Sequence, residues 1–96
     1  MSVSPEALKA SDTPPEDAPP VVLALWHSAH GDWDAAHVLV QDDKSVEAAW
    51  VHAHLHRVEG DIRNAAHWYN RAGKPVNKAS LDAEWGSLVQ AVAWSE

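Results

Sequence analysis

Residues 48–75 contain two amphipathic segments that meet at Gly60-Asp61, and this corner constrains the fold of the whole chain. A glycine readily takes the left-handed conformation that ends a helix, and an aspartate caps the first N–H groups of the next one. The pair therefore predicts a helix up to Gly60, a sharp turn, and a second helix after Asp61. The same pair occurs at Gly31-Asp32, so the corner is predicted twice.

Apolar residues recur at intervals of three and four along five segments, which is the period of an α-helix. The predicted helices cover residues 21–30, 33–41, 46–58, 62–72 and 80–95. The third of them is apolar on two sides, which is typical of a helix packed between two neighbours. We therefore expect an all-α fold of five short helices, stacked as antiparallel helix-turn-helix pairs and completed by a C-terminal capping helix.

Residues 1–20 differ from the rest of the chain in composition. They hold five of the six prolines, four acidic residues and one lysine, with few large apolar side chains. Such a segment buries too little surface to offset the entropy lost on ordering. We expect a disordered tail over residues 1–20, with a short recognition peptide around Ala7-Leu8 as the alternative, and a single helical domain over residues 21–96.

Charge and hydropathy exclude two classes of partner. The formal net charge is −7 and the basic residues are scattered, whereas nucleic acids and anionic membranes attract clustered Lys and Arg. The longest apolar run, Val21 to Trp26, is far shorter than the roughly 20 residues that span a bilayer. The chain has no cysteine, which excludes thiolate metal sites. With no signal-peptide pattern at the N-terminus, we expect a cytoplasmic protein.

Small and aromatic residues surround the corner at Gly60 with regular spacing: Ala53, Ala65, Tyr69, Ala72 and Pro75. This pattern resembles a tetratricopeptide-type repeat, in which a helix-turn-helix unit has Gly near the turn and Ala and an aromatic residue in its second helix. The two Gly-Asp pairs are 29 residues apart (60 − 31), against about 34 in that family. Residues 54–61 (HLHRVEGD) also resemble a stretch of short helical proteins of the uncharacterised bacterial type.

Stacked helix pairs present a concave face, and this predicts a non-enzymatic interaction module. Such a face receives a peptide, a partner protein or a second copy of the chain. Six tryptophans exceed what a core of this size needs, and Trp is enriched at binding hot spots. Trp68 and Trp94 are the expected contacts to the partner, with Arg71 on the polar side of the same helix as Trp68. No residue pattern predicts catalysis.

The histidines support an alternative function, the binding or sensing of a divalent metal ion such as zinc or another transition metal. His52 and His56 are four residues apart and share one helical face, and His27 and His30 are three apart. If the first and third predicted helices pack side by side, four imidazoles converge. The competing interpretation is that these rings only fill space and form hydrogen bonds where helices pack against each other. His37, on an apolar stripe, is expected at the edge of the core.

Overall fold

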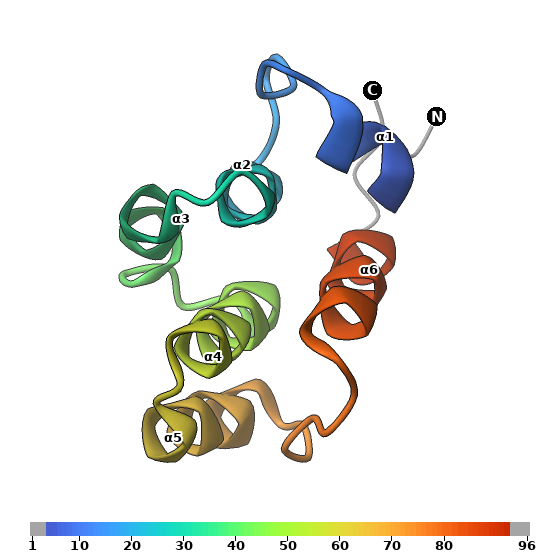
Figure 1. Ribbon diagram of the computed structural model, residues 1–96. Helices are drawn as coiled ribbons and strands as arrows, with labels where there is room; N and C mark the ends of the chain where they lie inside the picture. The colour runs from blue at the N-terminus through green and yellow to red at the C-terminus, as the bar shows by residue number, and fades with distance from the viewer. Residues whose placement is uncertain (1–3, 93–96) are drawn as a thin grey trace.

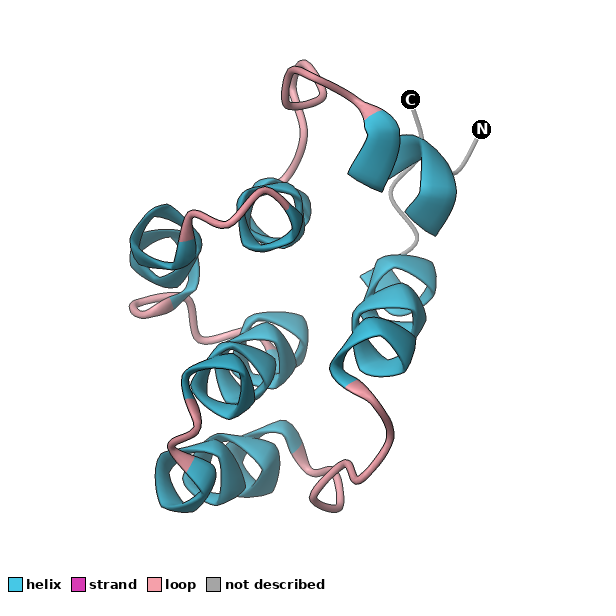
Figure 2. Cartoon of the chain, in the orientation of Figure 1, coloured by secondary structure: helices cyan, strands magenta, loops and turns pink. Residues whose placement is uncertain are grey.

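The computed structural model describes residues 4–92, and this part of the chain forms six α-helices and no strands (Figures 1 and 2). The helices are α1 (Pro5–Ala10), α2 (Pro20–Ala29), α3 (Trp33–Val40), α4 (Val46–Glu59), α5 (Ile62–Ala72) and α6 (Leu81–Val92). The all-α prediction is confirmed, with six helices in place of five. Between residues 4 and 92, no helix combines the length and the hydropathy that crossing a membrane requires.

Glycine and aspartate end and start the paired helices as the sequence predicts. Gly60 has φ 85° and ψ 11° and ends α4 in the left-handed conformation. The Asp61 side chain then accepts a hydrogen bond of 3.2 Å from a backbone N–H of α5. Gly31 has φ 79°, and Asp32 accepts a bond of 3.1 Å from a backbone N–H of α3. These short corners turn α3 back on α2 and α5 back on α4.

The helix pairs α2–α3 and α4–α5 have the most extensive contacts, and α3 packs on α4 to join them. These four helices form an arc, and α6 packs against α2 and α4 on its inner side (Figure 1). The main core is shared by α1, α2, α3, α4 and α6. Its buried residues are Leu8, Val22, Ala24, Leu25, Ala36, Val40, Ala48, Val51, Leu55, Trp85, Leu88 and Val89. A smaller cluster of Ala53, Ala65 and Tyr69 joins α4 to α5.

The segment that we expected to be a disordered tail contains α1. Ser4 caps this helix by accepting a backbone N–H at 3.1 Å, and Pro5 occupies the first turn, where its missing N–H costs nothing. Leu8 is only 1% exposed and belongs to the main core. Trp26 Nε1 also donates a hydrogen bond of 3.1 Å to the Ser11 carbonyl oxygen. The burial of Leu8 and this hydrogen bond therefore hold α1 beside α2 and α6.

Candidate metal centre

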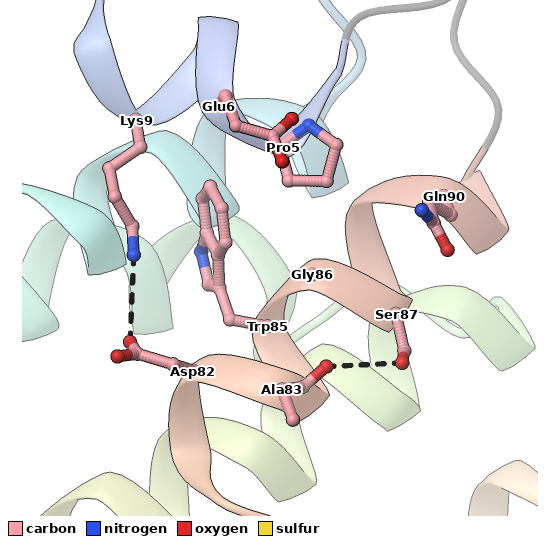
Figure 3. A pocket seen from close by; sticks show the side chains of 9 residues that line it. All are labelled: Pro5, Glu6, Lys9, Asp82, Ala83, Trp85, Gly86, Ser87 and Gln90. Atoms are coloured by element: carbon pink, nitrogen blue, oxygen red, sulfur yellow. Dashed lines mark hydrogen bonds and ion pairs between the residues drawn. The ribbon is translucent and has the colours of Figure 1, made fainter.

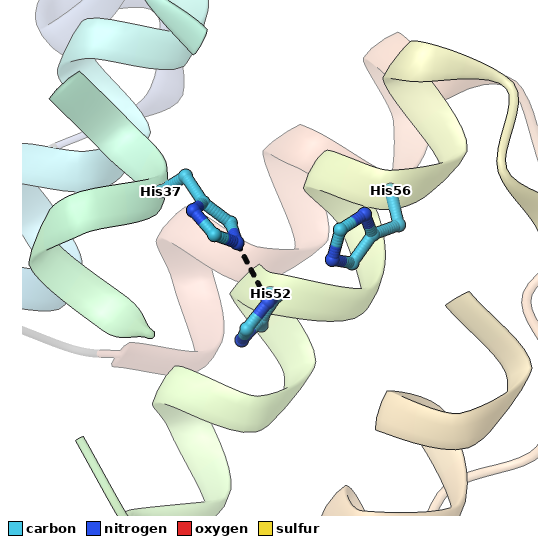
Figure 4. A group of neighbouring side chains, drawn as sticks. All are labelled: His37, His52 and His56. Carbon is cyan, nitrogen blue, oxygen red and sulfur yellow. Dashed lines mark hydrogen bonds between the residues drawn. The ribbon is translucent and has the colours of Figure 1, made fainter. Parts of the chain in front are cut away.

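Three histidines from two helices come together where α3 packs on α4 (Figure 4). His37 comes from α3, and His52 and His56 lie one turn apart on α4. One ring nitrogen of each histidine lies within 4.8 Å of the other two. The Nε2 atoms of His37 and His52 are 3.0 Å apart and share a hydrogen bond. The predicted His52/His56 pair is thus completed by a third imidazole.

A carboxylate orients the third ring. Glu59, one turn after His56 on α4, accepts a hydrogen bond from His56 Nδ1. In the neutral form of His56, this bond places the proton on Nδ1 and the lone pair on Nε2. Histidines that ligate metals very commonly donate their second ring nitrogen to a carboxylate in this way. Asp61 lies near the same two residues, but it and Glu59 are exposed.

His52 is buried among aromatic rings and has one nitrogen without a partner. Its ring stacks on Trp68, with centroids 3.8 Å apart, and on His56, with centroids 4.8 Å apart. In residues 4–92, His52 Nδ1 is the only buried side-chain nitrogen or oxygen that lacks a hydrogen bond. An unpaired buried polar atom costs about 1–3 kcal/mol. A phenylalanine would fill this space without that cost, but it would lose the hydrogen bond between His52 Nε2 and His37 Nε2.

Two rings of the cluster, those of His37 and His52, are in the protonation state that metal binding requires. Burial, together with the neighbouring rings of His37, His56 and His67, lowers the pKa of His52 to about 4. Burial and the nearby His56 also lower the pKa of His37, against a smaller opposite effect of neighbouring carboxylates. Both rings are therefore largely neutral at pH 7. A neutral imidazole nitrogen with a free lone pair is the form that ligates metal ions.

The second predicted histidine pair lies elsewhere. The rings of His27 and His30 both pack on Trp26 at the C-terminal end of α2, and His30 stacks on it with centroids 4.1 Å apart. Neither belongs to a group of three potential metal ligands in the part of the chain that the structure describes. The expected convergence of these two histidines with His52 and His56 is therefore absent. His37, expected only at the edge of the core, is the residue that joins the pair.

The residues predicted to contact a partner have different surroundings. Trp68 is partly buried, and one face of its ring is covered by His52. Arg71 is exposed, with its guanidinium carbon 5.4 Å from the centroid of the Trp68 ring. Trp94 lies outside the residues that the structure describes. Trp68 thus forms one wall of the histidine cluster, and a role of these residues in partner binding remains a prediction.

A second polar cluster, centred on Glu84 of α6, was not predicted. Glu84 is 0% exposed. Its Oε1 accepts hydrogen bonds from His54 Nδ1 and Arg57 Nη1, both at 2.7 Å, and its Oε2 accepts from Trp50 Nε1 at 3.1 Å and from the Tyr69 hydroxyl. Burial alone would raise the pKa of Glu84, but these four hydrogen bonds outweigh it and lower the pKa to about 2. The carboxylate is therefore ionised at neutral pH.

Two pockets border α6. One, of about 350 Å³, lies between α1 and α6, where Lys9 forms an ion pair of 3.5 Å with Asp82 (Figure 3). The other, of about 300 Å³, shares Lys9, Asp82 and Trp85 with the first and extends to His54. None of the three clustered histidines lines either pocket. The histidine cluster and the pockets are therefore separate features.

Comparison with known proteins does not assign a function. No protein-family model matches the chain, and no curated protein and no solved structure is significantly similar to it. The resemblance to tetratricopeptide-type repeats thus remains a prediction, and the function has to be argued from the residues themselves.

Proposed function

We propose that this chain is a metal-binding protein that holds one divalent transition-metal ion between His37, His52 and His56. The observation that carries the proposal is the convergence of three imidazole nitrogens from two packed helices. Imidazole nitrogen suits zinc, copper, nickel and iron, and three histidines are a common ligand set for zinc. The chain offers no thiolate that would compete for the ion.

The spacing of the nitrogens fits one ion. Zinc–nitrogen bonds are about 2.0–2.1 Å long, so two nitrogens on one tetrahedral ion lie about 3.3 Å apart. The Nε2 atoms of His37 and His52 are already 3.0 Å apart. The group as a whole spans no more than 4.8 Å. The His56 nitrogen, which lies no more than 4.8 Å from the other two, has to move towards them for all three to reach one ion. Three protein ligands leave a coordination position for water or a further ligand.

An ion also removes a conflict between two of the rings. In the hydrogen bond between His37 Nε2 and His52 Nε2, one nitrogen has to carry a proton, and its lone pair is then lost for binding. Shifting that proton to Nδ1 frees both Nε2 lone pairs for the ion. Because His37 belongs to α3 and His52 to α4, coordination ties these two helices together. Metal binding should therefore stabilise the folded chain.

The proposal is tested by adding zinc, nickel or copper to metal-free protein while following the melting temperature and the tryptophan fluorescence. At a free metal concentration 100 times the Kd, a site present only in the folded state adds about 2.7 kcal/mol of stability. His52→Phe keeps an aromatic ring against Trp68 and should abolish that gain. His30→Phe, outside the cluster, is the matched control and should retain it.

Two results would contradict the proposal. One is a wild-type protein that neither gains stability nor saturates at one ion per chain. The other is a His30→Phe variant that loses the gain as fully as His52→Phe does, because the ion would then bind to histidines that the cluster does not contain.

A further inference from the structure

His54 connects the buried carboxylate of Glu84 to the pocket of about 300 Å³ beside α6. The residue is only 2% exposed, and its Nδ1 is bonded to Glu84. In residues 4–92, only one buried side-chain nitrogen or oxygen lacks a hydrogen bond, and it is His52 Nδ1. His54 Nε2 is not among the sealed atoms without a partner, and His54 is one of the residues that line the pocket.

The hydrogen-bond network fixes the chemical character of that nitrogen. Glu84 is ionised. Its Oε1 accepts a hydrogen bond of 2.7 Å from His54 Nδ1. Arg57 Nη1 lies 2.7 Å from the same carboxylate oxygen and balances its charge. In the neutral form of His54, the bond to Glu84 places the single proton on Nδ1, and Nε2 is then a hydrogen-bond acceptor. His54 therefore offers a hydrogen-bond acceptor, Nε2, to a ligand in the pocket that it lines.

The remaining walls favour an uncharged ligand. Lys9 and Asp82 are the two charged residues that line the pocket, and they pair with each other at 3.5 Å (Figure 3). Each charge therefore has a partner of opposite sign beside the pocket. The indole of Trp85 adds apolar ring atoms, its Nε1 being bonded to the Leu25 carbonyl oxygen at 2.9 Å, and the Lys9 ammonium lies over the ring, 5.2 Å from its centroid. The other lining side chains are Ser28, Ala29, Val58 and Leu81.

We infer that this pocket binds a small neutral molecule with a hydroxyl group and an apolar body, of the phenol or alcohol class, whose hydroxyl donates a hydrogen bond to His54 Nε2. The pocket is at the small end of the range for ligand sites, which suits a single ring or a short branched chain. Glu84 is a positioning residue in this site, because it sets the tautomer of His54 without touching the ligand. The site is independent of the histidine cluster between α3 and α4.

Phenol and toluene are matched probes, since they have the same ring and size and differ in the hydroxyl. Both are titrated into ¹⁵N-labelled protein in the presence of a chelator, so that the metal site has no part in the result. Phenol should bind with saturation and about tenfold more tightly than toluene, which is the effect of one net hydrogen bond. The ¹⁵N signal of His54 Nε2 should move with the same saturation curve.

A variant that fills the pocket tests whether phenol binds in this pocket. Ala29→Leu adds bulk from α2 without changing His54 or Glu84, and should weaken phenol binding at least tenfold. Ala91→Leu makes the same change at an exposed position of α6 outside the pocket and should leave binding unchanged. Equal or tighter binding of toluene would overturn the inference, because the pocket would then be an apolar cavity in which His54 takes no part. Absence of saturable phenol binding, or saturation that leaves His54 Nε2 unmoved, would overturn it as well.

Discussion

Replacing Glu84 by glutamine tests whether the buried carboxylate holds the helices together through its charge. Glutamine keeps the size of the side chain and one oxygen acceptor. It removes the negative charge that faces Arg57 Nη1 at 2.7 Å and places an amide donor where two donors already point. Two donors point at each carboxylate oxygen of Glu84. The substitution therefore leaves the two donors that face the new amide group without their acceptor, and Arg57 without its anion.

The size of the effect follows from the pKa. Hydrogen bonds that outweigh burial lower the pKa of Glu84 from 4.5 to about 2. A shift of one pKa unit corresponds to about 1.4 kcal/mol, so the ionised carboxylate contributes about 3 kcal/mol to the free energy of unfolding. Because the folded-state pKa is below the unfolded one, this contribution is complete above about pH 4.5 and is lost as the pH falls towards 2. Glu84→Gln should thus be about 3 kcal/mol less stable than wild type at pH 7, and this difference should shrink in acid.

Urea unfolding followed by circular dichroism at pH 7, 4.5 and 3 measures these differences. Asp82→Asn is the control, because Asp82 lies on the same helix but its side chain is 90% exposed, and exposed ion pairs contribute little. A difference between wild type and Glu84→Gln that stays constant from pH 7 to 3 would refute the reasoning, since packing and not charge would then be responsible. A difference below about 1 kcal/mol at pH 7 would show that the network offers no net stabilisation.

Three further predictions concern stability. Leu8→Ala should lower the free energy of unfolding by about 2–5 kcal/mol in urea titrations, because it empties a buried site in the main core; no change would mean that α1 is not part of the fold. Gly60→Ala should cost about 1 kcal/mol through its left-handed φ, while Gly86→Ala, in a helix and facing open space, should stabilise by up to about 1 kcal/mol; equal melting temperatures for the two variants would contradict this. The metal-free protein should lose about 3 kcal/mol as the pH falls from 6.5 to 4, because the unfolded chain protonates His52 before the folded one does. His52→Phe should largely remove that dependence, and an unaltered pH profile in this variant would argue against it.

The helices at the two corners could be predicted because their signals are local. Gly60 and Asp61 act within one turn of their own position, and the apolar period of α4 and α5 needs no knowledge of the rest of the chain. The helix α1 escaped prediction because its order depends on tertiary contacts, chiefly the burial of Leu8. Its local signal was nevertheless present, since Ser4 and Pro5 are typical of the start of a helix.

Two of the three histidines of the candidate metal centre could be predicted in the same way. His52 and His56 share a face of α4 by their spacing alone. The third ligand comes from α3, and whether His37 or the His27/His30 pair faces them depends on how α2 and α3 are rotated against α4. The packing of the whole core sets this rotation. It therefore cannot be predicted from the spacing of residues along one helix.

The Glu84 network could be inferred in part. Glu84 lies four residues before Leu88 and so beside the apolar stripe of α6, where a carboxylate needs partners. The sequence does not say which partners, because Trp50, His54 and Arg57 come from a helix that is distant along the chain.

The most direct test of the proposed function is X-ray absorption spectroscopy of the protein loaded with one equivalent of zinc. Coordination by His37, His52 and His56 predicts a first shell with three imidazole nitrogens at about 2.0 Å, and the loss of one imidazole in His37→Phe. A first shell made of oxygen with at most one imidazole, or a spectrum that His37→Phe leaves unchanged, would contradict the proposed centre.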